Sequence, residues 1–145
     1  MIGIVLVTHH HLGDALIEVA RMLYGKPEKI ISVPLLEGES IEDLQKKVLD
    51  ALEKIDAKDG ALILVDLFGG TPMNALALLA VERNDIEIIT GVNVPMLLTV
   101  LMEREEEGIT VKELAKKALE AGREGIVDVR EKLVSKLVQK LRKES

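Results

Sequence analysis

The three histidines of the chain stand side by side at His9, His10 and His11, and its 145 residues contain no other histidine and no cysteine. Imidazole is the side chain best suited to act as a base or nucleophile near neutral pH. The histidines directly follow the apolar segment 2–7, which is typical of a buried parallel strand. Ligands of open α/β sheets bind just beyond the carboxyl ends of such strands. We therefore expect a functional site at the histidines.

A carboxylate is expected beside the first of these histidines. The apolar segment 60–65 predicts another strand, and Asp66 follows it directly. In a sheet with the strand order 2-1-3-4, the first and third strands are neighbours, which brings His9 and Asp66 together. A carboxylate that accepts one ring N–H fixes the tautomer of the imidazole and leaves the other nitrogen free to react.

The glycine-rich turn after Asp66 predicts an anion-binding site. Gly69, Gly70 and Thr71 precede a predicted helix, and a second helix is predicted to start after His11. Free N–H groups at helix N-termini and in glycine turns bind phosphate, and the Thr71 hydroxyl adds a donor. Together with a nucleophilic imidazole, these groups predict phosphoryl transfer through a phosphohistidine.

No nucleotide-binding motif accompanies this pattern. The sequence matches neither G-x-x-x-x-G-K-[ST] nor the dinucleotide fingerprint. We therefore expect no cofactor, and the phosphoryl group would arrive on another protein.

Each of these features also has a purely structural interpretation. His9 is then a loop residue, Asp66 and Asn93 are caps, and Gly69 and Gly70 form a tight turn. The histidine run is not expected to bind a metal, because neighbouring residues of an extended segment point to opposite sides. The expected placement of His9 and Asp66 at adjacent strand ends favours the functional interpretation.

The pattern of apolar residues predicts an α/β fold of the flavodoxin-like, doubly wound type, with parallel strands in the order 2-1-3-4. Ser40 with Asp43, and Thr110 with Glu113, predict capped helix starts. Thr71 and Pro72 predict an N-cap and a first helical residue. The expected strands are 2–7 (with its end at 8–9), 29–35, 60–65 and 86–90, and the expected helices are 12–24, 40–55, 71–83, one from 95, and one from 110 to 122–125.

Composition narrows the class of protein. The net charge is −6 and the only aromatic residues are Tyr24 and Phe68, both of which disfavour a nucleic-acid partner. No signal peptide and no membrane span are expected, which predicts a cytoplasmic protein. The lack of cysteine excludes thiol catalysis.

The last twenty residues stand apart from the βα pattern. Residues 126–129 alternate like a short strand, and an apolar helical stripe follows within a basic stretch, 130–145. We expect a domain at 1–130 and a basic helical tail at 131–145. The tail is expected to pack on its own domain or on a second subunit, with an anionic membrane or another partner as the alternative. The stripe consists of Leu133, Val134, Leu137, Val138 and Leu141.

Four segments give the chain a family resemblance: Ile4–His9, Leu64–Asn74, Thr90–Leu97 and Glu120–Gly125. Across residues 1 to about 130 the sequence resembles the enzyme IIA domain of the mannose family of the bacterial sugar phosphotransferase system (PTS). The segments that carry V-D-x-x-G-G-[ST]-P-x-N and G-V-N-x-P-M-L are the most specific.

The resemblance implies a phosphoryl carrier. By motif position His9 would take a phosphoryl group from phospho-HPr and pass it to a IIB component, which phosphorylates sugar that enters through the membrane subunits IIC and IID. Asp66 would be the partner carboxylate and Thr71 the hydroxyl near the phosphate. The family also implies a homodimer in which the last strand, here 126–129, is exchanged between subunits.

The chain departs from the family at His10, where glycine is frequent, and it ends at Ser145, so IIB would be a separate protein. Thr8, His10, His11 and Asn93 remain candidates for the rim of the site. Two other functions stay open: a phosphoryl-donor subunit of a dihydroxyacetone kinase, and a non-enzymatic regulatory or ligand-binding module of flavodoxin-like fold.

Overall fold

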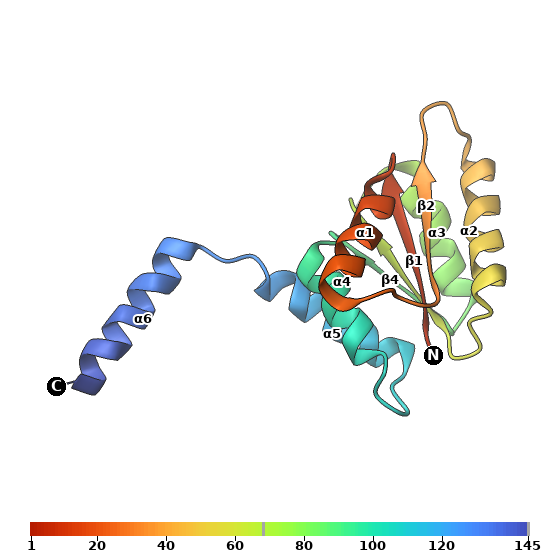
Figure 1. Cartoon of the computed structure of the whole chain (residues 1–145). Coiled ribbons are helices and arrows are strands. Elements are labelled where there is room, and N and C mark those ends of the chain that lie inside the picture. The colour runs from red at the N-terminus through yellow and green to blue at the C-terminus, as the bar shows by residue number, and fades with distance from the viewer. Residues whose placement is uncertain (68, 145) are drawn as a thin grey trace.

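A parallel four-stranded sheet forms the centre of the protein (Figure 1). The computed structural model describes residues 1–67 and 69–144, without the side chains of Thr71 and Pro72. The strands run in the order β2-β1-β3-β4, which confirms the predicted fold. They are β1 (Gly3–His9), β2 (Ile30–Leu35), β3 (Ala61–Val65) and β4 (Ile86–Thr90).

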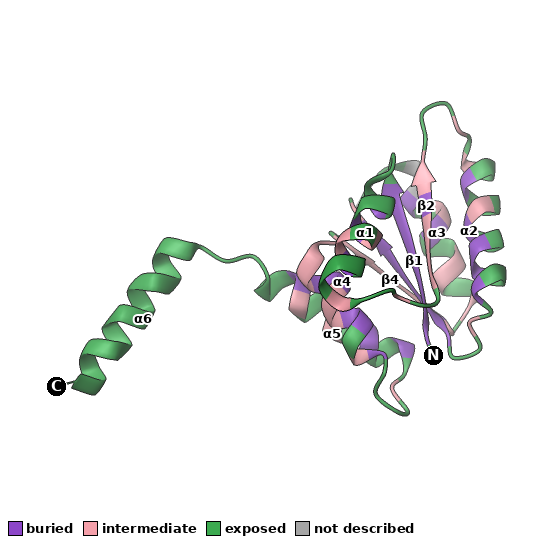
Figure 2. Cartoon of the chain, viewed as in Figure 1, coloured by how far each residue is buried: buried purple, intermediate pink, exposed green. Residues whose placement is uncertain are grey.

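Helices cover both faces of the sheet, and each layer has its own aliphatic core. Alternate residues of β1 point to opposite faces, so Leu6 packs in the core beneath α1, α4 and α5, whereas Val7 packs in the core beneath α2 and α3. Figure 2 shows β1 buried between these layers, and the residues of β2 and β4, at the edges of the sheet, are mostly of intermediate exposure. The helices are α1 (Leu12–Tyr24), α2 (Ile41–Ile55), α3 (Gly70–Glu82), α4 (Val94–Glu103), α5 (Val111–Glu124) and α6 (Val129–Glu144).

The predicted helix starts are confirmed at α2 and α5 and corrected at α3. Ser40 and Thr110 each form a reciprocal capping box with the residue three positions on. Helix α3 instead begins at Gly70 with Gly69 as its N-cap, so the prediction of Thr71 as N-cap was wrong. The two glycines adopt φ angles of 127° and 80°, which let the chain turn into the helix earlier than the Thr-Pro signal indicates.

A buried arginine joins the amino-terminal ends of the strands. Arg104 is only 5% exposed, and its guanidinium donates to the carbonyl oxygens of Ile2 (3.1 Å), Lys29 (3.2 Å) and Glu28. Burial lowers the pKa of Arg104, and the nearby side chains of Tyr24 and Glu105 oppose that shift. Arg104 therefore connects α4 to the starts of β1 and β2.

The C-terminal segment differs from the expectation. Residues 126–128 form no strand in the single chain, and α6 begins at Val129, because the Asp128 carboxylate accepts the backbone N–H of Glu131 (3.1 Å) and caps a helix there. Helix α6 extends away from the body and every described residue in it is exposed, so the expected packing on its own domain was wrong (Figures 1 and 2). Among the described residues, no helix has the length and apolar character needed to cross a membrane.

Candidate active site

His9 and Asp66 meet at the carboxyl end of the sheet, as the strand order predicts. The Nδ1 atom of His9 lies 3.2 Å from both carboxylate oxygens of Asp66. The backbone N–H of His9 also donates to Asp66 Oδ2 at 2.9 Å. The carboxylate therefore holds both the backbone and the ring of His9, which orients the ring and leaves Nε2 as the free nitrogen.

The two side chains of this pair differ in exposure. The His9 side chain is 64% exposed and that of Asp66 is 13% exposed. A large protein partner can therefore reach the imidazole, while the orienting carboxylate is mostly shielded from water. This is the geometry expected of a nucleophile that reacts with another macromolecule.

The chain turns sharply after His9. His10 has a φ angle of 53°, in the left-handed region that favours glycine. This conformation accounts for the preference for glycine that the family resemblance implies at this position. The turn leads into α1, whose N-cap is His11.

Thr8 stabilises this turn from the interior of the protein and is not part of the rim of the site. It is fully buried, and its Oγ1 accepts the backbone N–H of Gly13 at 2.7 Å. A Cβ at Gly13 would lie 2.5 Å from Ser32 Oγ, so glycine is what allows α1 to approach the sheet this closely. The prediction of Thr8 as a rim residue was wrong, because the position of a residue near a strand end does not show whether a helix covers it.

His10 and His11 lie on the exposed surface near the pair. Their rings meet edge to face with centroids 5.0 Å apart. His11 Nδ1 is 2.9 Å from Asp14 Oδ2, and both side chains are more than half exposed. The structure thus contains a second imidazole–carboxylate pair, within one helix turn.

Asn93 has a structural position. Its Oδ1 accepts the backbone N–H of Met96, and its Nδ2 donates to the carbonyl of Gly122, each at 3.0 Å. The amide thus caps α4 and joins it to α5. The interpretation of Asn93 as a helix cap is confirmed.

The glycine turn presents the N-terminus of α3. Gly69 and Gly70 are exposed, and the helix has no side-chain hydrogen bond at its N-cap. Its first N–H groups are therefore available to an anion. The expected contribution of the Thr71 hydroxyl lies outside the described side chains.

Sequence reasoning missed a hollow beside His9. It has a volume of about 240 Å³ and lies between β2 and α2, with Leu35, Leu36 and Ile41 among its lining residues. Glu39 supports this wall by accepting from the Leu36 backbone (2.9 Å) and from Lys47 Nζ (2.7 Å). The hydrogen bond from Lys47 is the main reason why the pKa of Glu39 is lowered. The sequence signal for this hollow was the apolar pair Leu35 and Leu36, where the predicted strand 29–35 ends.

The charges around this hollow are acidic. Glu37 and Glu39 line it, and none of its described lining residues is a lysine or arginine. A phosphoryl group on His9 would therefore depend on N–H groups and on a partner protein for positive surroundings.

The parallel sheet in the order 2-1-3-4, with helices on both faces, places the chain in the doubly wound class of α/β proteins, with an exposed histidine beside a carboxylate at the carboxyl end of its strands. A family model described as "PTS system fructose IIA component", EIIA-man, matches residues 3–119. The chain therefore belongs to the EIIA-man family of PTS IIA components.

Curated relatives agree with this membership. The chain is 38% identical over 135 residues to a PTS system mannose-specific EIIAB component of Escherichia coli, covering 93% of this chain and 42% of that protein. It thus spans less than half the length of that relative. It is 41% identical over 105 residues to the PTS system fructose-specific EIIA component of Bacillus subtilis, covering 72% of each.

Solved structures share the fold. A phosphotransferase system component EIIA from Streptococcus agalactiae superposes with a TM-score of 0.81 at 28% identity, covering 90% of this chain and 99% of that one. A mannose/sorbose-specific IIA subunit from Enterococcus faecalis gives a TM-score of 0.75 at 20% identity, covering 88% and 93%, and supports the fold alone.

Proposed function

We propose that this chain is a phosphoryl carrier of a sugar phosphotransferase system, in which His9 accepts the phosphoryl group from phospho-HPr and passes it to a IIB component. The observation that carries the proposal is the contact of His9 Nδ1 with Asp66, which leaves Nε2 free on an exposed ring. Membership of the EIIA-man family supports the same activity.

The transfer needs no cofactor. Nε2 of His9 attacks the phosphorus, the N–P bond of the donor phosphohistidine breaks, and its electron pair returns to the donor imidazole. The His9 ring keeps its Nδ1 proton, so the phosphorylated ring becomes cationic, and Asp66 stabilises that charge. Transfer to the IIB component follows the reverse course with a nucleophile of that protein.

The turn before α3 is proposed to bind the phosphoryl oxygens. The exposed N-terminus at Gly69 and Gly70 offers N–H groups, and the Thr71 hydroxyl is proposed as a further donor. Because the hollow beside His9 is acidic, basic groups would come from the partner. This arrangement keeps the phosphoryl group transferable rather than trapped.

The assembly follows from the same proposal. The carrier domain spans 1–130, the tail spans 131–145, and the protein works in the cytoplasm with HPr and IIB, and indirectly with the membrane subunits IIC and IID. We further propose a homodimer in which residues 126–129 pair with β4 of the partner. The outer edge of β4 is unpaired in the described chain, and the apolar residue Ile126, at the start of the proposed exchanged strand, is 79% exposed.

The test is reconstitution with phosphoenolpyruvate, enzyme I and HPr, followed by mass spectrometry under conditions that preserve phosphohistidine. The wild-type chain is expected to gain one phosphoryl group and the His9→Ala variant none. His11→Ala is the matched control, because it also removes an exposed imidazole beside a carboxylate, and it should be phosphorylated normally. A His9→Ala chain that still accepts the group would refute the proposal.

A further inference from the structure

We infer that helix α6 binds the surface of an anionic lipid bilayer, with its apolar side in the lipid interface and its lysines at the headgroups. The contact goes beyond the proposed function. Only the role that we give it, which is to hold the carrier beside the membrane subunits, rests on that function. The inference is supported by the apolar side of α6, by its charge and by the place where the helix leaves the body.

The apolar side of α6 is broad and uncovered. A coiled-coil contact uses a narrow seam of residues, whereas a helix that lies in a lipid interface has a wide apolar sector and a basic polar side. At 3.6 residues per turn the aliphatic residues of α6 span about 140° of its circumference. Each of them is at least 42% exposed: Leu133, Val134, Leu137, Val138 and Leu141.

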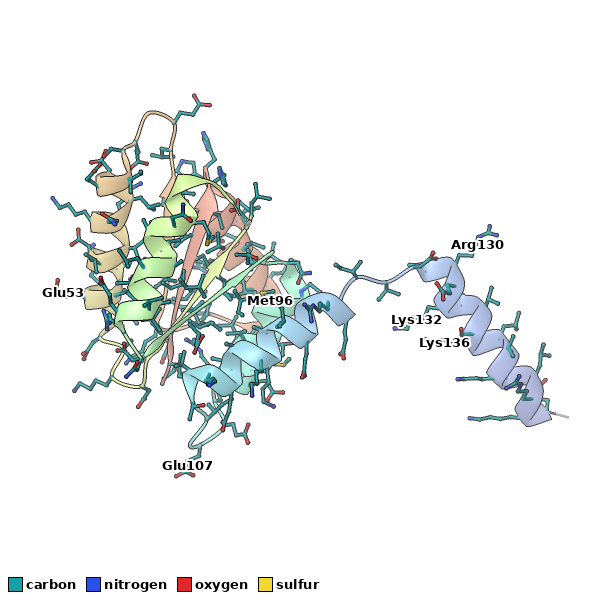
Figure 3. All side chains as sticks on the ribbon, turned by 180° about the vertical axis from the view of Figure 1, so that it is seen from behind. Glu53, Met96, Glu107, Arg130, Lys132 and Lys136 are labelled. Carbon is teal, nitrogen blue, oxygen red and sulfur yellow. The ribbon has the colours of Figure 1, made fainter. Side chains whose placement is uncertain are left out.

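The polar side of α6 is basic. Residues 132–143 hold five lysines or arginines and no acidic residue. Figure 3 shows Lys132 and Lys136 on a helix that stands clear of the body. Together with Lys140 they place like charges four residues apart, which destabilises a helix in water. Anionic headgroups would remove that repulsion, because they attract basic segments at a membrane surface.

The charge of the rest of the chain limits the contact to α6. Residues 130–145 hold six basic and two acidic residues, a net charge of +4, which leaves −10 for residues 1–129. An anionic surface therefore attracts the helix and repels the body. Because α6 extends away from the body (Figure 1) and repulsion is screened beyond about 8 Å at physiological ionic strength, the helix can bind while the body stays in solution.

Two protein occupants fit the helix less well than a bilayer does. A second α6 would bring a charge of +4 against +4. Energetically dominant side chains at protein interfaces are enriched in Trp, Tyr and Arg, with Leu and Val under-represented, and the apolar sector of α6 consists of leucine and valine alone. Aliphatic side chains of this kind need no shaped pocket in a lipid interface.

Helix α6 leaves the body at the end of the sheet that holds His9. Asn93, which follows the carboxyl end of β4, donates to the carbonyl of Gly122 near the end of α5 at 3.0 Å. The chain then passes through residues 126–128 into α6. A bound α6 would therefore hold the reactive end of the carrier near the bilayer. A dimer would present two such helices, so two weak contacts would give a stronger and still reversible attachment.

Fluorescence tests the contact directly, since the chain has no tryptophan of its own. Leu137→Trp places a reporter in the apolar sector, and Ser135→Trp, on the opposite side of the helix, is the matched control. We expect vesicles of phosphatidylglycerol and phosphatidylcholine to shift the Leu137→Trp emission to the blue. Vesicles of phosphatidylcholine alone should not shift it, and the Ser135→Trp emission should stay as in water with both.

Three results of this experiment would overturn the inference. Anionic vesicles might leave the Leu137→Trp emission unshifted, or they might shift both reporters equally, which would mean that α6 does not bind by its apolar side. An emission of Leu137→Trp that is already shifted without vesicles would mean that a protein surface covers this side.

Charge reversal tests the role of the lysines. Lys132→Glu with Lys136→Glu should weaken binding to anionic vesicles at least about tenfold in a flotation assay, because attraction becomes repulsion. Lys112→Glu with Lys116→Glu is the matched control, since it reverses two exposed lysines four residues apart on α5. The control should change binding less than about twofold, because α5 belongs to the body. Equal weakening by both pairs would refute a contact through α6.

Phosphorylation of His9 separates this inference from the proposed function. Without vesicles, the variant with Lys132→Glu and Lys136→Glu should accept phosphate from HPr at the wild-type rate, because α6 stands clear of the body. A wild-type chain that takes phosphate but does not bind anionic vesicles refutes the membrane contact alone. A wild-type chain that binds them but takes no phosphate refutes the carrier function alone.

Discussion

The two ends of the β-sheet hold their polar groups in opposite environments. At the carboxyl end, His9 is largely exposed and makes its main side-chain contact with one carboxylate, Asp66. At the amino end, Arg104 is almost fully buried and donates to three backbone carbonyls. The enclosed guanidinium of Arg104 stabilises the fold, whereas the exposed imidazole of His9 is accessible for reaction. Changes at the two ends should therefore separate activity from stability.

The largest expected effect on activity is at the carboxyl end. His9→Ala should lose phosphoryl acceptance altogether while its unfolding midpoint stays near that of the wild type, since the side chain is mostly in solvent. Reconstituted phosphorylation and denaturant unfolding measure the two effects. A His9→Ala protein that is strongly destabilised would contradict the separation.

The amino end should show the reverse. Arg104→Met should lower the free energy of unfolding by about 3 kcal/mol, because the carbonyls of Ile2 and Lys29, directly before β1 and β2, lose their donor. Phosphorylation of the folded fraction should be unchanged. Urea unfolding followed by circular dichroism gives the stability. A loss below about 1 kcal/mol would show that Arg104 does not hold the strands together.

Asp66→Asn should slow phosphoryl transfer by about 100-fold while the protein stays folded, because the charge that stabilises the cationic ring is removed. The amide oxygen can still accept the His9 backbone N–H. Rapid-quench kinetics with phospho-HPr measure the rate. Asp14→Asn is the matched control, since it alters the carboxylate beside His11 and should leave the rate near wild type. Equal slowing by both variants would mean that only net charge matters.

The smallest effect is expected at the turn. His10→Gly should raise the free energy of unfolding by about 0.5–1 kcal/mol, because glycine adopts a φ of 53° without the cost that a side chain imposes. His11→Gly serves as the control, because His11 has a φ of −99° and gains nothing from glycine. Thermal unfolding of both variants measures the difference. A destabilised His10→Gly protein would show that the His10–His11 ring contact outweighs the strain.

Local patterns predicted the carboxyl end of the sheet better than the amino end. Apolar runs that end at His9 and Asp66, together with strand order, are enough to bring this pair together. Arg104 contacts carbonyls at least 75 positions away in the chain, and nothing in the surrounding sequence indicates that separation. The sequence also did not show that His10 takes a left-handed conformation, because histidine is not a residue that signals one.

Two differences between the predicted secondary structure and that of the single chain have a shared cause. The start of α3 was placed at Thr71 because Thr-Pro is a strong helix signal, but Gly69 and Gly70 allow an earlier turn. The segment 126–129 alternates like a strand, yet Asp128 caps a helix, and a strand requires a neighbour to pair with. In both cases a competing local interaction decided the backbone, and whether 126–129 pairs in a dimer remains a prediction.

The ring nitrogen that carries the phosphoryl group tests the central claim most directly. Phosphorylated protein labelled with ¹⁵N at histidine, examined by ³¹P and ¹⁵N NMR, distinguishes the two nitrogens. Because Asp66 holds Nδ1 of His9, the account predicts a single phosphohistidine, on Nε2 of His9. Phosphate on Nδ1, or on His10 or His11, would contradict it.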